Sequence, residues 1–243
     1  MASRSLALQN VHQPGRCCMA FHPSKQYLYI GGQQGFIKQY SYGLASHSLQ
    51  LSKTMDDADI RHDDVINAIS FTASGDYFAV CSDDGECTLF RHPSCSMTSI
   101  LCKFTCGVSS ISFISAPYSF LLAISSDDGT IKIVNALMYT EKYFEFPCHP
   151  DGVRYLQWLN YAPSPYRTST EKYLAVAQCN GTLSIWKVLT TNIFTASIKE
   201  MELKVVKIKE FDKAFPKIKG GDINQRLSFD STQNGKFIAI PGN

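Results

Sequence analysis

The chain has 243 residues, 44% of them hydrophobic, and a formal net charge of +2. This length and apolar content suit one large all-β domain or two small domains, and the near-neutral charge argues against a dominant nucleic-acid-binding or polybasic membrane-binding surface. The nine cysteines form no CxxC pair. The sequence also has no signal peptide and no apolar run of about 20 residues. Together with the scattered cysteines, these features predict a soluble cytosolic or nuclear protein with reduced thiols.

A short pattern occurs four times: two small or polar residues, a tight turn ending in glycine, and an alternating strand. The turn glycines are Gly35, Gly85, Gly129 and Gly181. A bulky residue stands five positions after each glycine, namely Tyr40, Phe90, Val134 and Trp186. Asx-Gly between β-rich runs predicts a two-residue hairpin turn in which both central residues have positive φ. Four hairpins of one pattern predict a repeat protein.

Two further predicted strands precede each hairpin, and the first of them ends in an aromatic anchor. These strand pairs span 16–21 and 27–30, 65–71 and 77–80, 108–113 and 120–124, and 153–158 and 173–176. A fifth unit begins at Leu227-Ser228-Phe229, continues over 236–240 and stops at Asn243. Each full unit leaves room for a fourth, outer strand before the next one.

A histidine stands nine residues before the anchor in three of the five units. These histidines are His12, His62 and His149, and the other two units have Phe104 and Gly220 at this position. Four-stranded units of roughly 40–45 residues with an opening histidine are typical of WD40 propellers. We interpret the histidine as a buried hydrogen-bond partner within its own blade rather than as a catalyst or ligand.

Two insertions interrupt the repeat. Residues 160–172 carry prolines and hydroxyls and predict a surface loop. Residues 189–222 are rich in lysine. Within them, apolar residues and lysines alternate imperfectly over 203–209, as in an outer strand with its lysines on the solvent-exposed face. A solvated strand and loop is the simplest interpretation. A nucleic-acid patch is the alternative, with the candidates Lys204, Lys207, Lys209, Lys213, Lys217 and Lys219.

The sequence contains none of the common catalytic motifs, and we expect neither an enzyme nor a cofactor. The pairs Asp83-Asp84 and Asp127-Asp128 fall in equivalent hairpin turns, where aspartate suits the turn geometry. A zinc site from Cys102, Cys106, Cys148 and His149 lacks the usual ligand spacing. Recognition of other macromolecules is therefore the default prediction.

Several segments resemble the N-terminal WD40 region of one replisome-adaptor family. This family contains the chromosome-transmission-fidelity and minichromosome-loss adaptors and the acidic nucleoplasmic DNA-binding protein of animals. The first unit, 12–40, resembles the family's opening blade. Lys103-Phe104-Thr105, followed by 126–134 with its Lys-Ile-Val ending, resembles a blade that reads KIV where most WD40 proteins read RIW. The closing stretch 235–241, with its Ala-Ile-Pro, resembles a later blade.

The resemblance implies a nuclear, non-catalytic adaptor that couples the replicative helicase to DNA polymerase α and supports DNA repair, cohesion and genome maintenance. In that family the helicase and polymerase peptides dock mainly on a second, C-terminal propeller, so this chain would contribute the N-terminal one, with DNA or chromatin as further possible partners and no membrane. The alternative is a WD40 scaffold of another pathway, such as a ubiquitin-ligase substrate receptor or a trafficking factor.

We expect a single all-β WD40 propeller, incomplete at its C-terminus, with about four full blades and part of a fifth. The approximate blade ranges are 12–60, 61–103, 104–147, 148–219 and 220–243. Such an arc does not close a seven-bladed ring and leaves sheet edges open. The 243-residue chain is therefore expected to be poorly soluble or oligomeric on its own.

Overall fold

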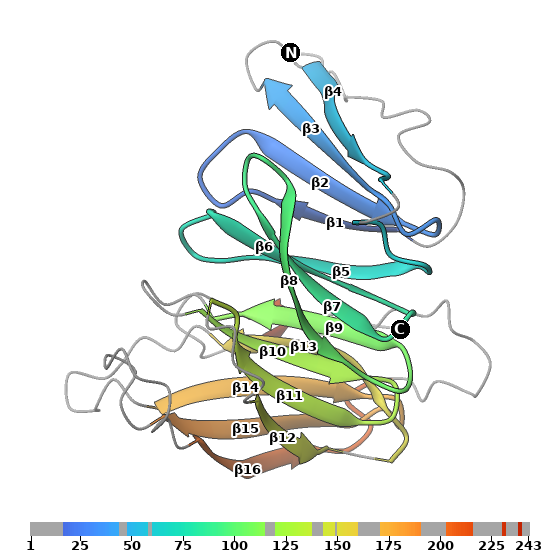
Figure 1. Cartoon of the computed structure of the whole chain (residues 1–243). Coiled ribbons are helices and arrows are strands. Elements are labelled where there is room, and N and C mark those ends of the chain that lie inside the picture. The colour runs from blue at the N-terminus through green and yellow to red at the C-terminus, as the bar shows by residue number, and fades with distance from the viewer. Residues whose placement is uncertain are drawn as a thin grey trace, which may run out of the picture.

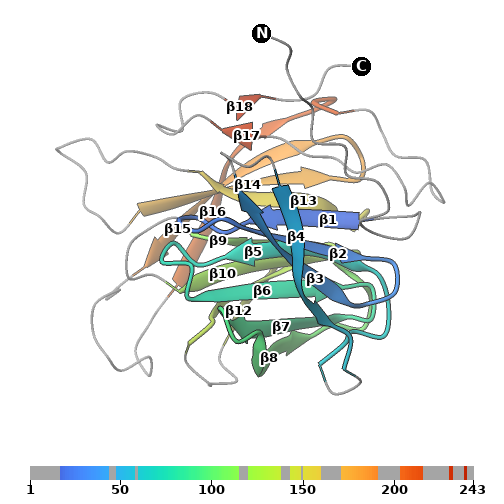
Figure 2. The ribbon, with the colours of Figure 1, turned by 90° about the horizontal axis from the view of Figure 1, so that it is seen from above.

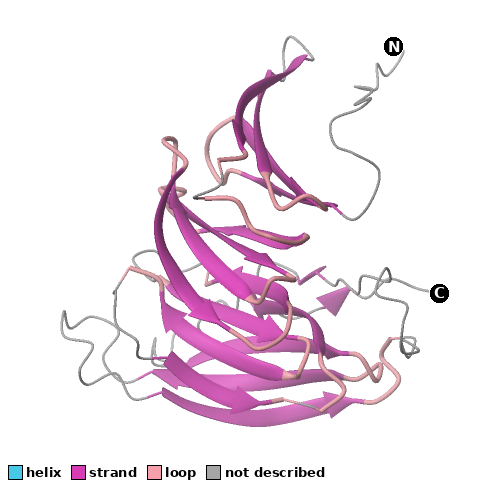
Figure 3. Cartoon of the chain, turned by 45° about the vertical axis from the view of Figure 1, so that its right-hand side comes forward, coloured by secondary structure: helices cyan, strands magenta, loops and turns pink. Residues whose placement is uncertain are grey.

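A computed structural model describes the chain over most of its length. The described residues are 17–43, 48–57, 60–114, 120–137, 143–148, 150–159, 171–190, 203–215, 230–231 and 238–239. Within these ranges every regular element is a β-strand and no helix occurs (Figure 3).

The strands form four antiparallel sheets of four strands each, joined in chain order (Figure 1). We call them blades 1 to 4. Blade 1 comprises β1 (Cys17–Phe21), β2 (Tyr27–Gly32), β3 (Ile37–Gly43) and β4 (Ser48–Met55). Blade 2 comprises β5 (Ile66–Phe71), β6 (Tyr77–Ser82), β7 (Glu86–Arg91) and β8 (Ser96–Lys103).

Blades 3 and 4 repeat this order. Blade 3 comprises β9 (Val108–Phe113), β10 (Leu121–Ser126), β11 (Thr130–Asn135) and β12 (Tyr143–Pro147). Blade 4 comprises β13 (Val153–Leu159), β14 (Glu171–Gln178), β15 (Leu183–Thr190) and β16 (Leu203–Phe211). The predicted inner strands, the outer strand at 203–209 and the all-β class are thereby confirmed.

Two short strands, β17 (Asp230–Ser231) and β18 (Ile238–Ala239), pair with each other in the region of the expected fifth unit. Most of that unit, and most of the 160–172 insertion, lie outside the described residues. The division of the chain into five blades stays a prediction there.

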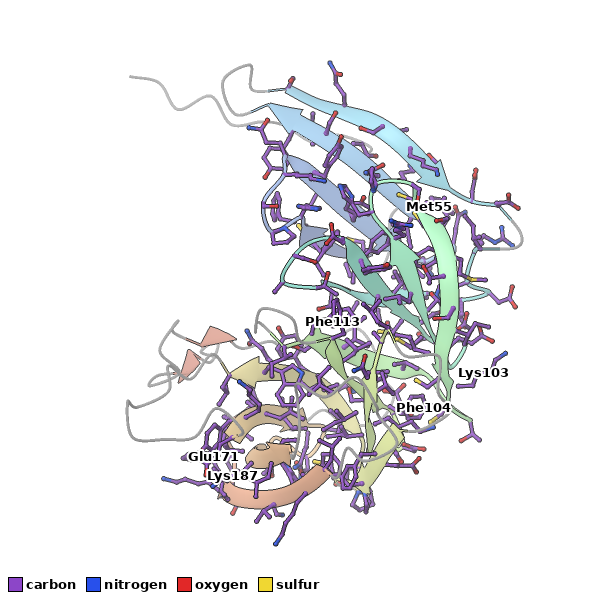
Figure 4. All side chains as sticks on the ribbon, turned by 60° about the vertical axis from the view of Figure 1, so that its left-hand side comes forward. Met55, Lys103, Phe104, Phe113, Glu171 and Lys187 are labelled. Atoms are coloured by element: carbon purple, nitrogen blue, oxygen red, sulfur yellow. The ribbon has the colours of Figure 1, made fainter. Side chains whose placement is uncertain are left out.

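The first strands of neighbouring blades lie side by side, so that β1, β5, β9 and β13 form the inner row of the arc. The same strands are neighbours when the molecule is seen from above (Figure 2). The aromatic anchors end these strands. Phe113 lies between blades 2 and 3 (Figure 4), and the Trp158 indole N–H donates to the Ser112 carbonyl at 2.9 Å. The anchors therefore join one blade to the next.

The bulky residue five positions after each turn glycine is buried in all four blades. In blades 2 to 4 it packs against the preceding blade together with the residues seven and five positions before the glycine. In blade 2 these three are Phe78, Val80 and Phe90. The recurring pattern is thus a packing pattern, in which each blade buries one apolar face on its predecessor.

The hairpin turns differ from the prediction. Each turn glycine has positive φ, between 77° and 89°, but no residue before it does, since Cys95 and Lys213 are the non-glycine residues with positive φ in the described ranges. The Gly85 amide bonds to the Ser82 carbonyl at 3.3 Å, which makes Asp83 and Asp84 the centre of an ordinary turn and the glycine the residue that follows it. This is the longer hairpin loop, in which only the last residue needs the left-handed conformation.

Candidate interaction surface

The histidine of blade 2 is a structural hydrogen-bond partner, as predicted. His62 is buried; its Nδ1 lies 2.7 Å from Asp84 Oδ2 and its Nε2 lies 2.8 Å from Thr88 Oγ1. All three groups belong to blade 2, so the ring ties the opening of the blade to its own hairpin. The other two predicted histidines, His12 and His149, lie outside the described residues.

Asp84 is held by several donors at once. Its carboxylate also accepts hydrogen bonds from the amides of Asp63 at 3.1 Å and Glu86 at 2.8 Å. Burial by itself would raise the pKa of Asp84, but the bonds from His62 and from the two amides outweigh it and lower the pKa. A carboxylate kept ionised by fixed donors serves the fold and is not a general acid.

Blade 3 fills the equivalent position with a different chemistry. Phe104 occupies the histidine position, and Lys132, three residues after the turn glycine like Thr88, places its ammonium 4.1 Å from the centre of the Phe104 ring. Lys132 also donates to the Lys103 carbonyl at 3.1 Å and lies 3.8 Å from Glu145. The buried lysine is thus satisfied by a cation–π contact, a carbonyl and a carboxylate.

In blade 4 a cysteine takes this place. The Cys148 amide donates to the Gly129 carbonyl at 2.9 Å, just as the His62 amide donates to the Gly35 carbonyl at 3.1 Å. The Cys148 thiol lies 3.8 Å from Ser184 Oγ. Burial raises the pKa of this thiol to about 11, so it is not an activated nucleophile.

The backbone bond that marks an opening residue recurs after blade 4. The Phe215 amide donates to the Gly181 carbonyl at 2.9 Å, which is the bond that marks the opening residue of blades 2 to 4. The sequence pattern instead placed this position at Gly220, which lies outside the described residues. Counting back from the anchor missed Cys148 because the connections differ in length from blade to blade, and the position at Gly220 stays a prediction.

A row of polar side chains lies where the inner strands begin. Each of β5, β9 and β13 has a β-bulge, at Asn67, Ser109 and Arg154 respectively. The side-chain amide of Asn67 donates through Nδ2 to Asp83 Oδ1 at 2.5 Å, and Arg154 Nη1 donates to Asp127 Oδ1 at 3.1 Å. Bulges re-aim side chains, and here they direct Asn67 and Arg154 toward turn aspartates, whereas the Ser109 hydroxyl donates to the Ser125 carbonyl at 3.2 Å. We call the three bulge residues and the two aspartates the rim.

The Asp-Asp pairs therefore divide their roles. The second aspartate of each pair closes the turn, since the Thr130 amide donates to Asp128 Oδ1 at 2.8 Å, as Glu86 does to Asp84. The first aspartate of each pair, Asp83 or Asp127, belongs to the rim. A Cβ on Gly107 would stand 3.0 Å from Asp83 Oδ1 and 3.1 Å from Asp127 Oδ2, so both carboxylates lie close to this backbone.

The rim presents carboxylates, an amide, a hydroxyl and a guanidinium from three adjacent blades. The side chains of Arg154 and Asp127 are 22% and 35% exposed, so they are accessible to a partner. Such a mixture suits hydrogen bonds and ion pairs with another macromolecule. The sequence offered one weak signal for it, a polar residue directly after the first apolar residue of β5 and of β13.

A pocket of about 440 Å³ lies at the opposite ends of the inner strands, where β1, β5 and β9 finish. Its lining is mainly apolar and includes Phe21, Ile69, Phe71, Phe113 and Ile114. Phe21 is 59% exposed at its edge, whereas Phe113 is buried. The sequence predicted the aromatic anchors but not that three of them would line one hollow.

The candidate lysines are spread along one strand and its end. Lys204, Lys207 and Lys209 lie on β16, Lys213 lies in the turn after it, and Lys217 and Lys219 lie outside the described residues. The Lys207 ammonium lies 2.6 Å from Glu210 and 5.7 Å from the centre of the Trp186 ring, so part of its charge is neutralised locally. Nucleic-acid binding by these lysines stays a prediction.

The four candidate zinc ligands are distributed differently. Cys102 is buried in the core between blades 2 and 3, Cys106 lies 2.9 Å from Ser126 Oγ, Cys148 contacts Ser184, and His149 is not among the described residues. In the described ranges no three His, Cys, Asp or Glu side chains are grouped as metal ligands would be. The same ranges contain no helix that could span a membrane.

Residues 58–91 match the family described as WD domain, G-beta repeat. This stretch begins just before His62 and ends with β7, and so includes the His62–Asp84–Thr88 network. Solved WD40 repeats superimpose on the chain as a whole, and the WD40 repeats of RRP9 align with a TM-score of 0.58 over 80% of it. The fold is that of a WD40 β-propeller.

Two other solved structures extend this comparison. U3-55K aligns with a TM-score of 0.59 at 19% identity, over 80% of this chain and 52% of its own. The computationally designed Ika4 protein aligns with a TM-score of 0.55 at 17% identity, over 86% of this chain and 100% of its own. The chain thus spans about half the length of U3-55K and of RRP9, whose match is 51% of its chain at 18% identity. No relative was found among curated proteins.

Proposed function

We propose that this WD40 chain is a non-catalytic interaction scaffold and the N-terminal propeller of a nuclear replisome adaptor. The adaptor would link the replicative helicase to DNA polymerase α and support replication, repair and cohesion. The scaffold part rests on the WD40 fold, in which the opening residues of blades 2 to 4 each make a side-chain contact within their own blade. The adaptor part rests on the resemblance of short segments to one family.

The contact between Phe104 and Lys132 is the observation that carries the adaptor proposal. The two motifs that define the resemblance in blade 3 are Lys103-Phe104-Thr105 and Lys132-Ile133-Val134, which are far apart in sequence. Phe104 of the first motif and Lys132 of the second meet in space, with the ammonium 4.1 Å from the ring centre. Two matching motifs that form one buried contact support a shared blade design better than two independent short matches would.

An affinity purification from nuclear extract tests the proposal. The complete gene product and the 243-residue chain are used as parallel baits, with an unrelated WD40 propeller as the control. Helicase subunits and DNA polymerase α recovered by the complete product are the expected result. Their absence from the 243-residue bait places those contacts outside this propeller. Recovery of ubiquitin-ligase or vesicle-coat components instead would replace the proposal with a scaffold of another pathway.

Direct DNA binding is the second candidate, supported by the lysines of β16. It predicts that affinity for duplex DNA falls steeply as salt is raised, because bound counterions are released on binding. The triple variant K204E/K207E/K209E is expected to lose retention on a DNA column. An unchanged affinity would remove this candidate.

A further inference from the structure

The outer strand of blade 4 differs from the other outer strands. With nine residues, β16 is the longest strand described, and it carries three lysines against one glutamate. It also exposes Val206 at 41% and Ile208 at 50%. Of the other outer strands, β4 exposes Leu51 but has one lysine, Lys53, which donates to the Ser94 carbonyl at 2.6 Å. Strand β8 exposes Met97 and Ile100, but its one charged residue, Lys103, is paired with Glu86. Exposed apolar residues and unbalanced positive charge thus occur together on β16.

One edge of β16 has no strand beside it among the described residues. Its neighbour among the described strands is β15, with which it pairs antiparallel along its whole length. The register shifts at Ile208, since Ile185 pairs with Lys209 and Trp186 with Lys207. Ile208 is therefore a bulge residue without a partner in β15. The backbone on the other side of β16 keeps the amide and carbonyl groups that an added strand would need.

The charged groups separate onto two faces. Lys207 shares the face of Trp186 and is engaged by Glu210. Lys204, Val206 and Lys209 pair with odd-numbered residues of β15 and so share the opposite face. On that face two ammonium groups flank an exposed valine. Within the described residues neither Lys204 nor Lys209 forms an ion pair, whereas the neighbouring Lys187 of β15 is paired with Glu171.

We propose that the free edge of β16 binds an extended acidic peptide segment of a protein partner as a fifth strand of blade 4. The backbone edge would supply the affinity, as in other cases of strand addition, and the side chains would supply the selection. Lysines protect an edge against strands of like charge, and the same lysines attract a strand with glutamate or aspartate opposite them. Val206 and Ile208 require apolar residues between those acids.

A nucleic acid is a poorer match to this edge. A phosphate-binding surface gains from every cation, whereas here Glu210 neutralises Lys207 and two exposed aliphatic side chains interrupt the lysines. A strand edge with an alternation of charge and apolar surface is a feature that a β-strand can match and a phosphate backbone cannot.

Fluorescence anisotropy with three probes tests the inference on the 243-residue chain. The probes are a labelled octapeptide Glu-Thr-Val-Thr-Glu-Thr-Val-Thr, whose glutamates and valines alternate along one face of the strand, the same peptide with alternate amides N-methylated, and oligo-dT. We expect the first peptide to bind and N-methylation to weaken it about tenfold or more, because it removes the donors that face the edge. Equal binding of both peptides would overturn the inference, as would binding of oligo-dT alone.

Charge-reversal variants locate the site. K204E/K209E is expected to weaken the acidic peptide about tenfold and to gain binding of a lysine–valine octapeptide, a reversal that misfolding cannot produce. Ile100→Lys on the outer strand β8 is the matched control for Ile208→Lys on β16. Loss of binding in I208K with retention in I100K is expected, and equal loss in both would overturn the assignment to β16.

Discussion

Blades 2 and 3 fill the same position, at the opening of the blade, with side chains of different chemistry. In blade 2 a buried imidazole bridges a carboxylate and a hydroxyl, and in blade 3 a phenyl ring receives a buried ammonium. Figure 4 shows Phe104 beside Lys103 at the end of β8, the place that His62 takes at the start of blade 2. Both arrangements join the opening of a blade to its own third strand. The position is therefore defined by the contact it makes and not by the residue type.

The difference has an energetic consequence. Loss of the blade 2 ring removes a partner from the buried Thr88 hydroxyl and one of the several donors to Asp84. The blade 3 pair instead combines a ring with a lysine that also reaches a backbone carbonyl and an exposed carboxylate. Removing one partner from a buried polar network leaves the others unsatisfied, which costs more than the network contributes. Blade 2 should thus be the more sensitive of the two.

Transferring the blade 3 chemistry into blade 2 tests this comparison most strongly. His62→Phe is expected to lower the free energy of unfolding by about 3 kcal/mol, because Asp84 and Thr88 lose a buried partner. Adding Thr88→Lys should restore about 1 kcal/mol by placing an ammonium near the new ring. Urea unfolding of the two variants and of T88K alone measures the coupling. A double variant no more stable than H62F would show that the two arrangements are not interchangeable.

Acidification should weaken the contact between blades 1 and 2 before it weakens the contact between blades 2 and 3. His22 and His92 lie with ring centres 4.3 Å apart between blades 1 and 2, and both are buried. His22 Nδ1 accepts the amides of Ser24 at 3.1 Å and Lys25 at 3.0 Å, so a proton there would face two donors. Burial, followed by the neighbouring His22, lowers the pKa of His92 to about 4, and burial lowers the pKa of His22 as well.

These lowered pKa values determine how the stability depends on pH. Because the folded histidines stay neutral, the unfolded chain binds more protons as the pH falls below 6.5, and stability is lost between pH 6.5 and about 4. The expected loss is about 2 kcal/mol. Hydrogen exchange should show blade 1 amides exposed first. His92→Gln is expected to flatten this pH dependence, and an unchanged slope would mean that the pair does not control it.

The two turn aspartates offer a smaller contrast. Asp84→Ala removes a turn contact and the partner of His62, whereas Asp128→Ala removes the contact with the Thr130 amide and leaves the Phe104–Lys132 pair in place. We expect D84A to be more destabilising than D128A by about 1 kcal/mol in thermal unfolding. Equal effects would indicate that Asp84 acts through its turn alone.

The smallest effect is expected for Lys132→Met. Lys132 is buried, and methionine keeps the aliphatic stem while it removes the cost of burying a charge. The free energy of unfolding should therefore change by less than about 1 kcal/mol. A loss as large as that of H62F, measured under the same conditions, would show that the ammonium is as necessary to blade 3 as the imidazole is to blade 2.

The sequence by itself determined the repeat and the inner strands of each blade. These features follow from local rules, because turn glycines and a period of two are visible in a single strand. It also predicted that Phe104 and His62 are equivalent, since both were placed by counting from an anchor. The predicted two-residue hairpin loop was one residue too short. Asx-Gly is compatible with both a two-residue loop and a longer loop that ends in a left-handed glycine.

Only the tertiary structure decided how side chains from different segments meet. The contact between Phe104 and Lys132, the convergence of Asp83 and Asp127 on Gly107, and the place of Cys148 in blade 4 each join segments whose separation varies from blade to blade. The bulges that aim Asn67 and Arg154 are equally absent from the pattern, because a bulge arises from strand pairing and not from the strand alone. Periodicity records which face of a strand is buried, whereas the partner on that face depends on the path of the whole chain.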